Sequence, residues 1–145
     1  IFDLPASEPF ARKIVERYGL SGRIDFAGGD FLAGPLPGGR DVAWLSQVLH
    51  GEAPADAARL VKNAAAALTP GGLLCIQEFA LDDRRDGPLH AALFSLNMLV
   101  RTPAGQAYTE GEIAEMMTAA GAADIRPLEV RLPSHCRVLT GRMPT

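Results

Sequence analysis

The chain has 145 residues, enough for one domain with a buried core, and its 48% hydrophobic and 21% charged residues are ordinary for a globular protein. The net charge of −3 argues against a surface that tracks phosphates, because nucleic-acid binders usually carry a basic patch. No apolar run is long enough to span a bilayer. We therefore expect a protein whose partners are neither nucleic acids nor membranes.

Two cysteines, Cys75 and Cys136, lie in apolar, strand-like segments. Thiols in such places are more often buried and free than bridged, so a reducing, cytoplasmic setting is the default expectation. The chain opens with Ile1, without Met, inside what reads as a strand. This start indicates a fragment of a longer protein.

Strand and helix patterns alternate along the chain, beginning with a short apolar strand at residues 1–4. The next segment is predicted to be a helix that Ser7 caps and Gly19 stops, because its apolar residues recur at helical spacing. These residues are Phe10, Ile14 and Tyr18. A second strand is expected at residues 24–27 and, after a loop rich in glycine and proline, a third at residues 42–49.

The second half of the chain continues this alternation. A helix is predicted from Pro54, and a turn at residues 69–72 is expected to stop it. Its apolar stripe consists of Leu60, Val61, Ala64 and Leu68. Residues 73–79 read as a continuous apolar strand, of the kind that is buried on both faces of a parallel sheet. Residues 89–100 are apolar on most sides and are predicted to be a helix packed under a lid or a partner.

The last segments predict one more helix and two strands. Thr109 and Glu112 make a capping box, which marks the start of the helix. Strands are expected at residues 123–128 and 136–140, joined by residues 129–134. That connection is too short for a parallel crossover, so this pair should be antiparallel. The alternation elsewhere predicts an α/β fold with a largely parallel sheet.

Ligands of open α/β sheets bind beyond the carboxyl ends of the strands, so the residues there are candidates for a site. Asp3 closes the first strand and can accept the hydroxyls of a ribose, or it can simply cap the following helix. Asp30 closes the second strand after two glycines that would let a ligand approach the backbone. Phe31 beside it can pack on a purine. A plain glycine–aspartate turn is the alternative.

His50 closes the predicted third strand, and Glu78 closes the fourth. Histidine is the side chain that removes protons most often in enzymes, and a neighbouring carboxylate can fix its tautomer. The alternative for each residue is a partly solvated side chain at a strand end. His90 and His135 have no such placement and are interpreted as structural. No histidine and cysteine spacing fits a metal site.

Seven stretches stand in a recognisable order: FDLP at residues 2–5, RIDF running into GGDF at 23–31, LSQVLH at 45–50, LTPGG at 68–72, Glu78, NML at 97–99 and YTE at 108–110. In this order they resemble the S-adenosylmethionine-dependent O-methyltransferases of the caffeate, acetylserotonin and bacterial polyketide type. The resemblance covers nearly the whole chain. Each stretch alone is a weak signal, and the ordered set is fairly specific.

The resemblance implies a Rossmann-like class I methyltransferase sheet with an antiparallel last strand. The first strand and the glycine-rich loop of that sheet are missing from this chain. Residues 1–145 would then be a partial S-adenosylmethionine-binding methyltransferase domain. The absent strand is central in the family sheet, so the isolated fragment is expected to be inactive. The full-length protein is implied to be a homodimer.

The resemblance also implies roles for individual residues. Asp3 would hold the ribose of S-adenosylmethionine, and Asp30 and Phe31 would flank its adenine. Ser46 belongs to the same cofactor-binding set. His50 would be the general base, with Glu78 beside it, for a small hydroxylated acceptor that is aromatic or polyketide-like.

Three positions depart from the family pattern. His50 is followed by Gly51 and Glu52 in place of Asp and Trp, Ala107 stands at the position of a second acidic residue, and Ser46 replaces a frequent basic residue. These departures keep an alternative hypothesis open. In it, the chain belongs to a catalytically inactive, methyltransferase-like module that serves in binding or assembly.

Overall fold

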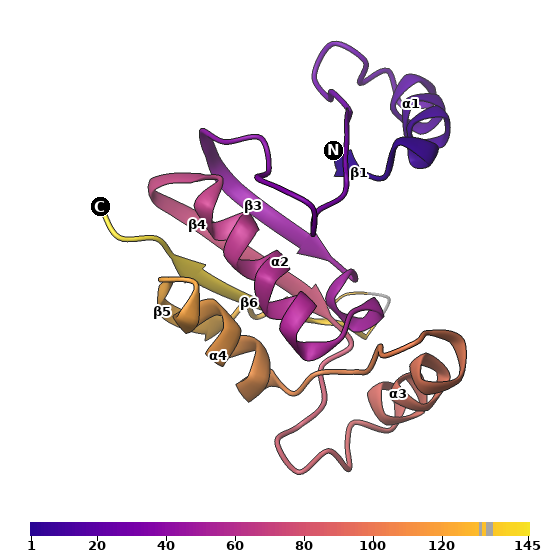
Figure 1. Ribbon diagram of the computed structural model, residues 1–145, viewed down its shortest axis with the longest axis vertical. Coiled ribbons are helices and arrows are strands. Elements are labelled where there is room, and N and C mark those ends of the chain that lie inside the picture. Colours follow the sequence, from indigo (N-terminus) through magenta and orange to yellow (C-terminus); the bar gives the residue numbers. More distant parts are fainter. Residues whose placement is uncertain (131, 133–134) are drawn as a thin grey trace.

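The computed structural model describes residues 1–130, 132 and 135–145, and it contains both helices and strands, which are interspersed along the chain (Figure 1). The helices are α1 (Glu8–Arg17), α2 (Pro54–Ala66), α3 (Leu89–Arg101) and α4 (Glu110–Ala119). The strands are β1 (Phe2–Asp3), β2 (Ala27–Gly28), β3 (Arg40–Ser46), β4 (Leu68–Glu78), β5 (Ala123–Pro127) and β6 (Arg137–Arg142). Among the described residues, none of the helices is long and apolar enough to cross a membrane.

The described strands form two sheets. β1 and β2 pair in parallel, and the other four strands lie in the order β3-β4-β6-β5. β3 and β4 are parallel, whereas β6 runs antiparallel to both of its neighbours. The expected antiparallel pair of last strands is therefore confirmed. The predicted connection at residues 129–134 includes residues 131, 133 and 134, which lie outside the described part of the chain.

The break between the two sheets falls beside β3, which is an edge strand of the four-stranded sheet. β1 and α1 stand apart from that sheet, across from β3 (Figure 1). Val42 and Trp44 on β3 are 53% and 49% exposed, although large apolar side chains in a complete α/β sheet are normally covered. Both side chains point to the face of β3 away from the core, so this face and the outer edge of β3 are bare at the point where the expected class I sheet would continue.

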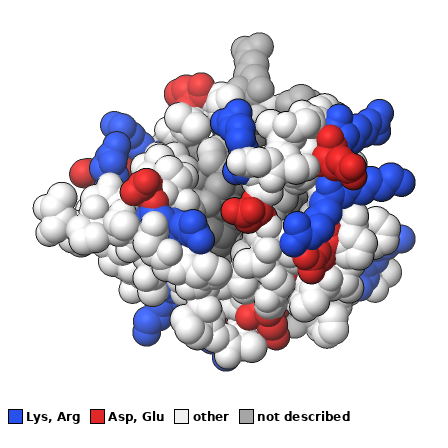
Figure 2. Space-filling model, turned by 90° about the horizontal axis from the view of Figure 1, so that it is seen from above, with Lys and Arg blue, Asp and Glu red and all other residues white. Residues whose placement is uncertain are grey.

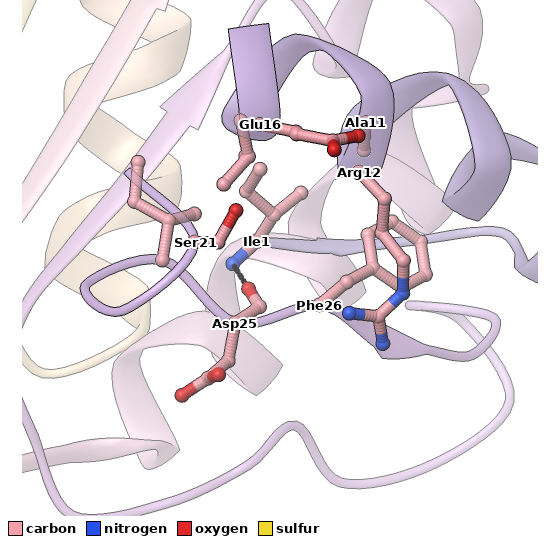
Figure 3. Close-up of a pocket in the computed structure, with 9 residues that line it drawn as sticks. Ile1, Ala11, Arg12, Glu16, Ser21, Asp25 and Phe26 are labelled. Atoms are coloured by element: carbon pink, nitrogen blue, oxygen red, sulfur yellow. Dashed lines mark hydrogen bonds between the residues drawn. The ribbon is translucent and has the colours of Figure 1, made fainter. Parts of the chain in front are cut away.

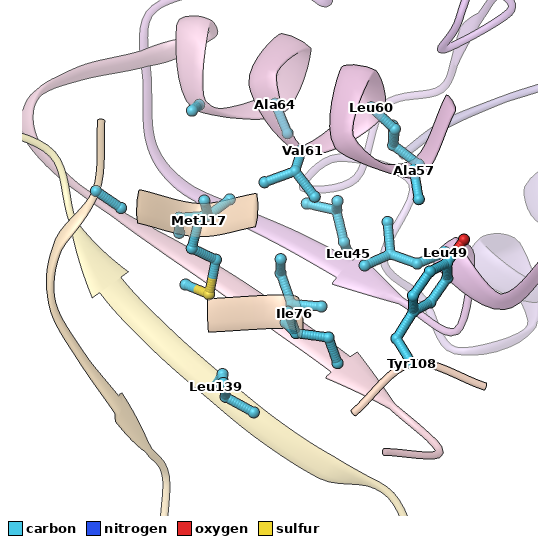
Figure 4. Close-up of a cluster of buried hydrophobic side chains, with 14 of the residues drawn as sticks. Leu45, Leu49, Ala57, Leu60, Val61, Ala64, Ile76, Tyr108, Met117 and Leu139 are labelled. Atoms are coloured by element: carbon cyan, nitrogen blue, oxygen red, sulfur yellow. The ribbon is translucent and has the colours of Figure 1, made fainter. Parts of the chain in front are cut away.

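The core lies between the four-stranded sheet and the two helices α2 and α4 (Figure 4). Val61 of α2, Ile76 of β4 and Met117 of α4 are fully buried there. Burial of each such side chain contributes roughly 1.5–3 kcal/mol. The sheet that carries the predicted site is therefore held on one face by a continuous apolar layer.

The predicted capping box at the start of α4 is confirmed. The Thr109 hydroxyl accepts a hydrogen bond from the Glu112 amide at 3.0 Å, and the Thr109 amide donates to Glu112 Oε2 at 2.8 Å. The two cysteines, Cys75 and Cys136, are buried and free, as expected. Burial raises the pKa of the Cys75 thiol, so this group is a poor nucleophile.

Helix α1 faces the small sheet with side chains that lie next to its predicted apolar stripe, and not with the stripe itself. Ala11 and Val15 line a cavity of about 250 Å³ together with Ile1 and Phe26 (Figure 3). The stripe itself lies in solvent: Phe10, Ile14 and Tyr18 are 73%, 52% and 70% exposed. The helix is thus present as predicted, but its apolar stripe has no partner in the described part of the chain.

Three local predictions are wrong. The strand expected at residues 24–27 is only Ala27–Gly28. Ser7 does not cap α1 with its side chain, because it belongs to a short 3₁₀ turn and already has helical backbone angles. The turn expected at residues 69–72 is part of β4, where Gly71 and Gly72 hydrogen-bond to the C-terminal residues Pro144 and Met143. Pairing with a distant segment overrides the local turn signal there.

Trp44 is the only tryptophan, so its fluorescence reports directly on the bare side of β3. We predict that in the 145-residue chain this tryptophan is readily quenched by acrylamide, because the side chain is half exposed. In a full-length protein whose other tryptophans, if any, are replaced by phenylalanine, the completed sheet and the segments packed on it should cover Trp44, and its emission should shift to shorter wavelength with weaker quenching. Equal quenching in the two proteins would contradict the assignment of this edge as the break in the sheet.

Candidate active site

His50 lies just beyond the carboxyl end of β3, but not on the strand as predicted. β3 ends at Ser46, and Gln47 has a positive φ of 55° that breaks the extended backbone. The chain then forms a single 3₁₀ turn over Leu49–Gly51, hereafter the His50 turn. The prediction of a strand to residue 49 is therefore wrong, and the histidine stands on a turn beside the end of β4.

The last residue of β4, Glu78, contacts this turn with both carboxylate oxygens. Oε1 accepts hydrogen bonds from the amides of Leu49 at 2.8 Å and His50 at 3.3 Å. Oε2 lies 2.8 Å from His50 Nδ1 and accepts from the Phe79 amide at 3.3 Å. Glu78 is only 3% exposed. A buried carboxylate needs such partners, and here they are the backbone and ring of the predicted base.

This arrangement determines which nitrogen of His50 is available. An ionised carboxylate can only accept hydrogen bonds, so the neutral ring must carry its proton on Nδ1 to bond Glu78. Nε2 then holds a free lone pair. The geometry gives a histidine whose Nε2 can take a proton from a nearby group, with Glu78 stabilising the imidazolium that forms.

Two aromatic rings border the His50 imidazole. Phe94 of α3 meets it edge-on, with ring centroids 4.7 Å apart and planes at 85°. Phe79, directly after β4, packs on Phe94 at 4.2 Å. His90 lies 5.2 Å from Phe79, and His135 lies 5.5 Å from His90. Their assignment as structural stays a prediction.

The predicted cofactor residues gather at a groove of about 830 Å³ between the two sheets. It is lined by Asp3 of β1, by Phe31 in the loop after β2, and by Ser46 at the end of β3. Asp30 does not line the groove, but it directly precedes Phe31. Asn63 of α2 donates to the Phe31 carbonyl at 2.9 Å and so ties this loop to the core helix. Three of the four predicted cofactor residues therefore face one space.

The two aspartates also make short-range hydrogen bonds. Asp3 Oδ1 accepts from the Leu4 amide at 2.7 Å, and Asp30 Oδ1 accepts from the Leu32 amide at 2.8 Å. These bonds fit the alternative of simple turn residues, and they use one oxygen of each carboxylate. Gly29 is one of the two glycines predicted to leave room for a ligand, and its small size also has another explanation. A Cβ there would lie 2.6 Å from the Phe2 ring, so packing within the small sheet requires glycine.

Ala107 stands where a second acidic partner was expected. It is 1% exposed and packs with Leu81 and Ala91 in a small apolar cluster. Among the described side chains, Glu78 is therefore the one carboxylate that hydrogen-bonds His50.

Charges of both signs are interspersed over the face seen in Figure 2, which shows no broad basic patch.

Two further residues contact the His50 turn, and sequence reasoning gave them no role. The Tyr108 hydroxyl donates to the Glu52 carbonyl at 2.5 Å, and Gly105 packs against the backbone of His50. Tyr108 belongs to the YTE stretch, but no residue pattern connects position 108 with position 52. Only the packing of the segment before α4 brings them together.

Comparison with known proteins identifies relatives of this chain. A sequence profile described as the O-methyltransferase domain matches residues 1–123. The chain is 36% identical over 141 residues to 3-hydroxy-5-methyl-1-naphthoate 3-O-methyltransferase of Streptomyces sahachiroi. That match covers 97% of this chain and 41% of the relative. The chain thus spans about two-fifths of the length of this curated relative.

Solved structures with the same fold include methyltransferases with bound small molecules. PigF from Serratia, solved with SAH, superposes with a TM-score of 0.88 at 32% identity, covering 98% of this chain and 42% of PigF. An O-methyltransferase family 2 protein from Planctomyces limnophilus, solved in complex with apigenin, superposes with a TM-score of 0.86 at 31% identity. It covers 98% of this chain, which spans 41% of that protein.

Proposed function

Because this chain belongs to the O-methyltransferase domain family, we propose that the protein containing it transfers a methyl group from S-adenosylmethionine to a hydroxyl of a small aromatic acceptor. The observation that carries the proposal is the bond between His50 Nδ1 and Glu78 at the carboxyl ends of two parallel strands. Within this family match, that pair has the form of a general base and its orienting carboxylate.

The residues around the groove suit S-adenosylmethionine. Asp3 offers a carboxylate for the ribose hydroxyls, and Phe31 offers an apolar ring for the adenine. Ser46 and Asp30 complete this proposed set, with one carboxylate oxygen of Asp30 already bonded to the Leu32 amide. When bound, the cofactor supplies an electrophilic methyl group. The structure of the relative PigF was solved with SAH, which supports this choice of cofactor.

The groove is bounded on one side by the bare edge of β3 and on the other by β1. A cofactor held between them would depend on the separation of the two sheets, which no strand fixes in this chain. We infer that residues 1–145 form a partial cofactor-binding domain. The isolated chain should therefore bind S-adenosylmethionine poorly and be inactive.

We assign His50 as the base that removes the acceptor's hydroxyl proton. With its own proton on Nδ1 held by Glu78, the ring accepts the incoming proton on Nε2, and the carboxylate stabilises the resulting charge. The acceptor oxygen thus becomes a better nucleophile as it takes the methyl group. The chain otherwise contributes alignment, which is a large part of the catalysis of a two-substrate transfer.

The surroundings of His50 favour a flat aromatic acceptor. Phe79 and Phe94 place ring surfaces next to the imidazole. Relatives act on or bind fused and linked rings, namely a hydroxynaphthoate and apigenin. We also propose that the full-length protein is a homodimer, supported by the apolar side chains that α3 exposes: Leu89, Leu93, Leu96, Leu99 and Val100. The two free, buried cysteines support a cytoplasmic location.

An alternative is an inactive module that binds a ligand or partner. The buried Ala107 favours it, because the apolar cluster around this residue leaves no carboxylate at the position of the second acid. The two functions differ in turnover, while both allow cofactor binding. The decisive measurements therefore separate affinity from rate.

The first of these measurements concerns cofactor affinity. In the full-length protein, Asp3→Ala and Asp30→Ala should each weaken S-adenosylmethionine binding by about 1–3 kcal/mol, the cost of leaving ligand donors unpaired. Calorimetric titration measures the loss, and Asp56→Ala serves as a control because this aspartate pairs with Arg59 on the solvent-exposed face of α2. If both variants bind with wild-type affinity, the two aspartates do not belong to the cofactor site.

The second measurement concerns the base. His50→Ala in the full-length protein should lower turnover by roughly 10²–10⁴-fold and leave cofactor affinity nearly unchanged. The deficit should shrink at alkaline pH, where the acceptor ionises in solution. Glu78→Gln should lower both turnover and melting temperature, because an amide must turn its NH₂ toward one of the donors that now surround Glu78.

His135→Ala is the matched histidine control, since this exposed ring contacts His90 and not His50. It should keep wild-type turnover. A His50→Ala protein with wild-type turnover at neutral pH would contradict the proposed mechanism, whatever its affinity for the cofactor.

A further inference from the structure

The His50 turn is held at both of its ends. At its start, Glu78 accepts hydrogen bonds from the amides of Leu49 and His50. At its end, the Tyr108 hydroxyl donates to the carbonyl of Glu52 at 2.5 Å. Tyr108 is only 2% exposed, so the donor side of this bond is well shielded from water. The two anchors come from different parts of the chain, the end of β4 and the segment that leads into α4.

Gly105 brings the same segment into direct contact with the turn. A Cβ at this position would lie 2.4 Å from the His50 carbonyl oxygen and 3.2 Å from the carbonyl carbon of Gly51. The Gly105 amide donates to Thr102 Oγ1 at 2.6 Å, and that hydroxyl donates to the Met98 carbonyl at 2.9 Å. The connection from α3 to α4 is therefore packed on the turn and tied to the end of α3.

The Tyr108 backbone is fixed as well. Its carbonyl accepts a hydrogen bond from the Leu81 amide at 2.9 Å, and the Glu110 amide donates to the Leu81 carbonyl at 3.0 Å. Leu81 lies three residues beyond Glu78, on the chain that leaves β4. The Tyr108 side chain thus connects the backbone pairing with Leu81 to the end of the His50 turn. Its hydroxyl bonds the Glu52 carbonyl, whose position depends on the conformation of that turn.

We propose that Tyr108 is a positioning residue for His50, which it holds in its productive orientation by fixing the end of the His50 turn. The inference rests on the proposed function, because it assigns a role in the same proton transfer. Tyr108 touches neither the ring of His50 nor a reacting atom in this arrangement. It acts through the backbone of Glu52, and its loss should let the turn shift and misalign Nε2. Misplacement of a catalytic group by a fraction of an ångström is enough to slow a reaction.

The hydroxyl is suited to this task over a wide pH range. Burial, the largest cause, raises the pKa of Tyr108 to about 12. The Gln106 side chain opposes this shift, and the nearby carboxylates of Glu112, Glu52 and Glu78 add to it. The group therefore remains a protonated donor at neutral and moderately alkaline pH. A difference between the pH profiles of the wild type and a Tyr108 variant then reflects the base and the acceptor, since Tyr108 keeps its proton in the wild type over this range.

The test is Tyr108→Phe in the full-length protein, which removes one hydroxyl and keeps the buried ring. Turnover is measured with labelled S-adenosylmethionine and the first member of a panel of hydroxynaphthoates and apigenin that the wild type methylates. We expect kcat to fall about threefold to tenfold at neutral pH, the effect of losing one ordinary hydrogen bond. The KM for S-adenosylmethionine should not change, and the deficit should shrink as the acceptor ionises at alkaline pH.

Tyr18→Phe is the control, because this tyrosine is 70% exposed on α1 and should leave all these quantities unchanged. Amide hydrogen exchange provides a readout without substrate. The Glu52 amide, which donates to the Leu49 carbonyl within the turn, should exchange faster in Tyr108→Phe at an unchanged melting temperature.

Wild-type kcat and pH profile in Tyr108→Phe would overturn the positioning role alone. A fall in kcat that is equal at every pH and accompanied by a lower melting temperature would also overturn it, since it indicates a general loss of stability. A wild-type protein that methylates no member of the panel would instead overturn the proposed function, and the positioning role with it.

Discussion

The candidate site depends on one buried carboxylate, that of Glu78. β3 and β4 run parallel and end together, so the residue that closes β4 meets the backbone that leaves β3. There Glu78 accepts hydrogen bonds from the amides that begin the His50 turn and from Nδ1 of the ring. The same group therefore shapes the turn and selects the tautomer. A carboxylate at 3% exposure without these donors would be costly, which couples the stability of this corner to its chemistry.

A second constraint is the division of the sheet. The proposed base, His50, lies on a turn at the end of the well-packed four-stranded sheet, which α2 and α4 support, whereas Asp3 lies on the small sheet across the groove. The proposed cofactor set is thus distributed over two sheets, and no strand among the described residues fixes the spacing between them. The exposed Val42 and Trp44 mark the same gap. The proposed pairing of His50 with Glu78 does not depend on this gap, whereas we expect cofactor affinity to depend on closing it.

Local signals predicted those parts of the fold that local physics determines. The capping box of Thr109 and the antiparallel final pair follow from short-range spacing, and both are confirmed. The strand predicted to reach residue 49 failed because Glu78 draws the backbone of the His50 turn out of the sheet. The contact between Tyr108 and Glu52 joins residues 56 apart and carries no pattern in either segment. Contacts of this kind arise only when the whole chain packs.

The central claim, that Glu78 holds His50 with a free Nε2, is tested most directly by the nitrogen chemical shifts of the histidine ring. Full-length protein labelled with ¹⁵N-histidine would be measured at slightly alkaline pH, with His90 and His135 as internal references. The arrangement predicts a His50 ring with its proton on Nδ1 and a bare Nε2, and loss of this pattern in Glu78→Gln. A wild-type ring protonated on Nε2, or one that exchanges freely between tautomers, would contradict the claim.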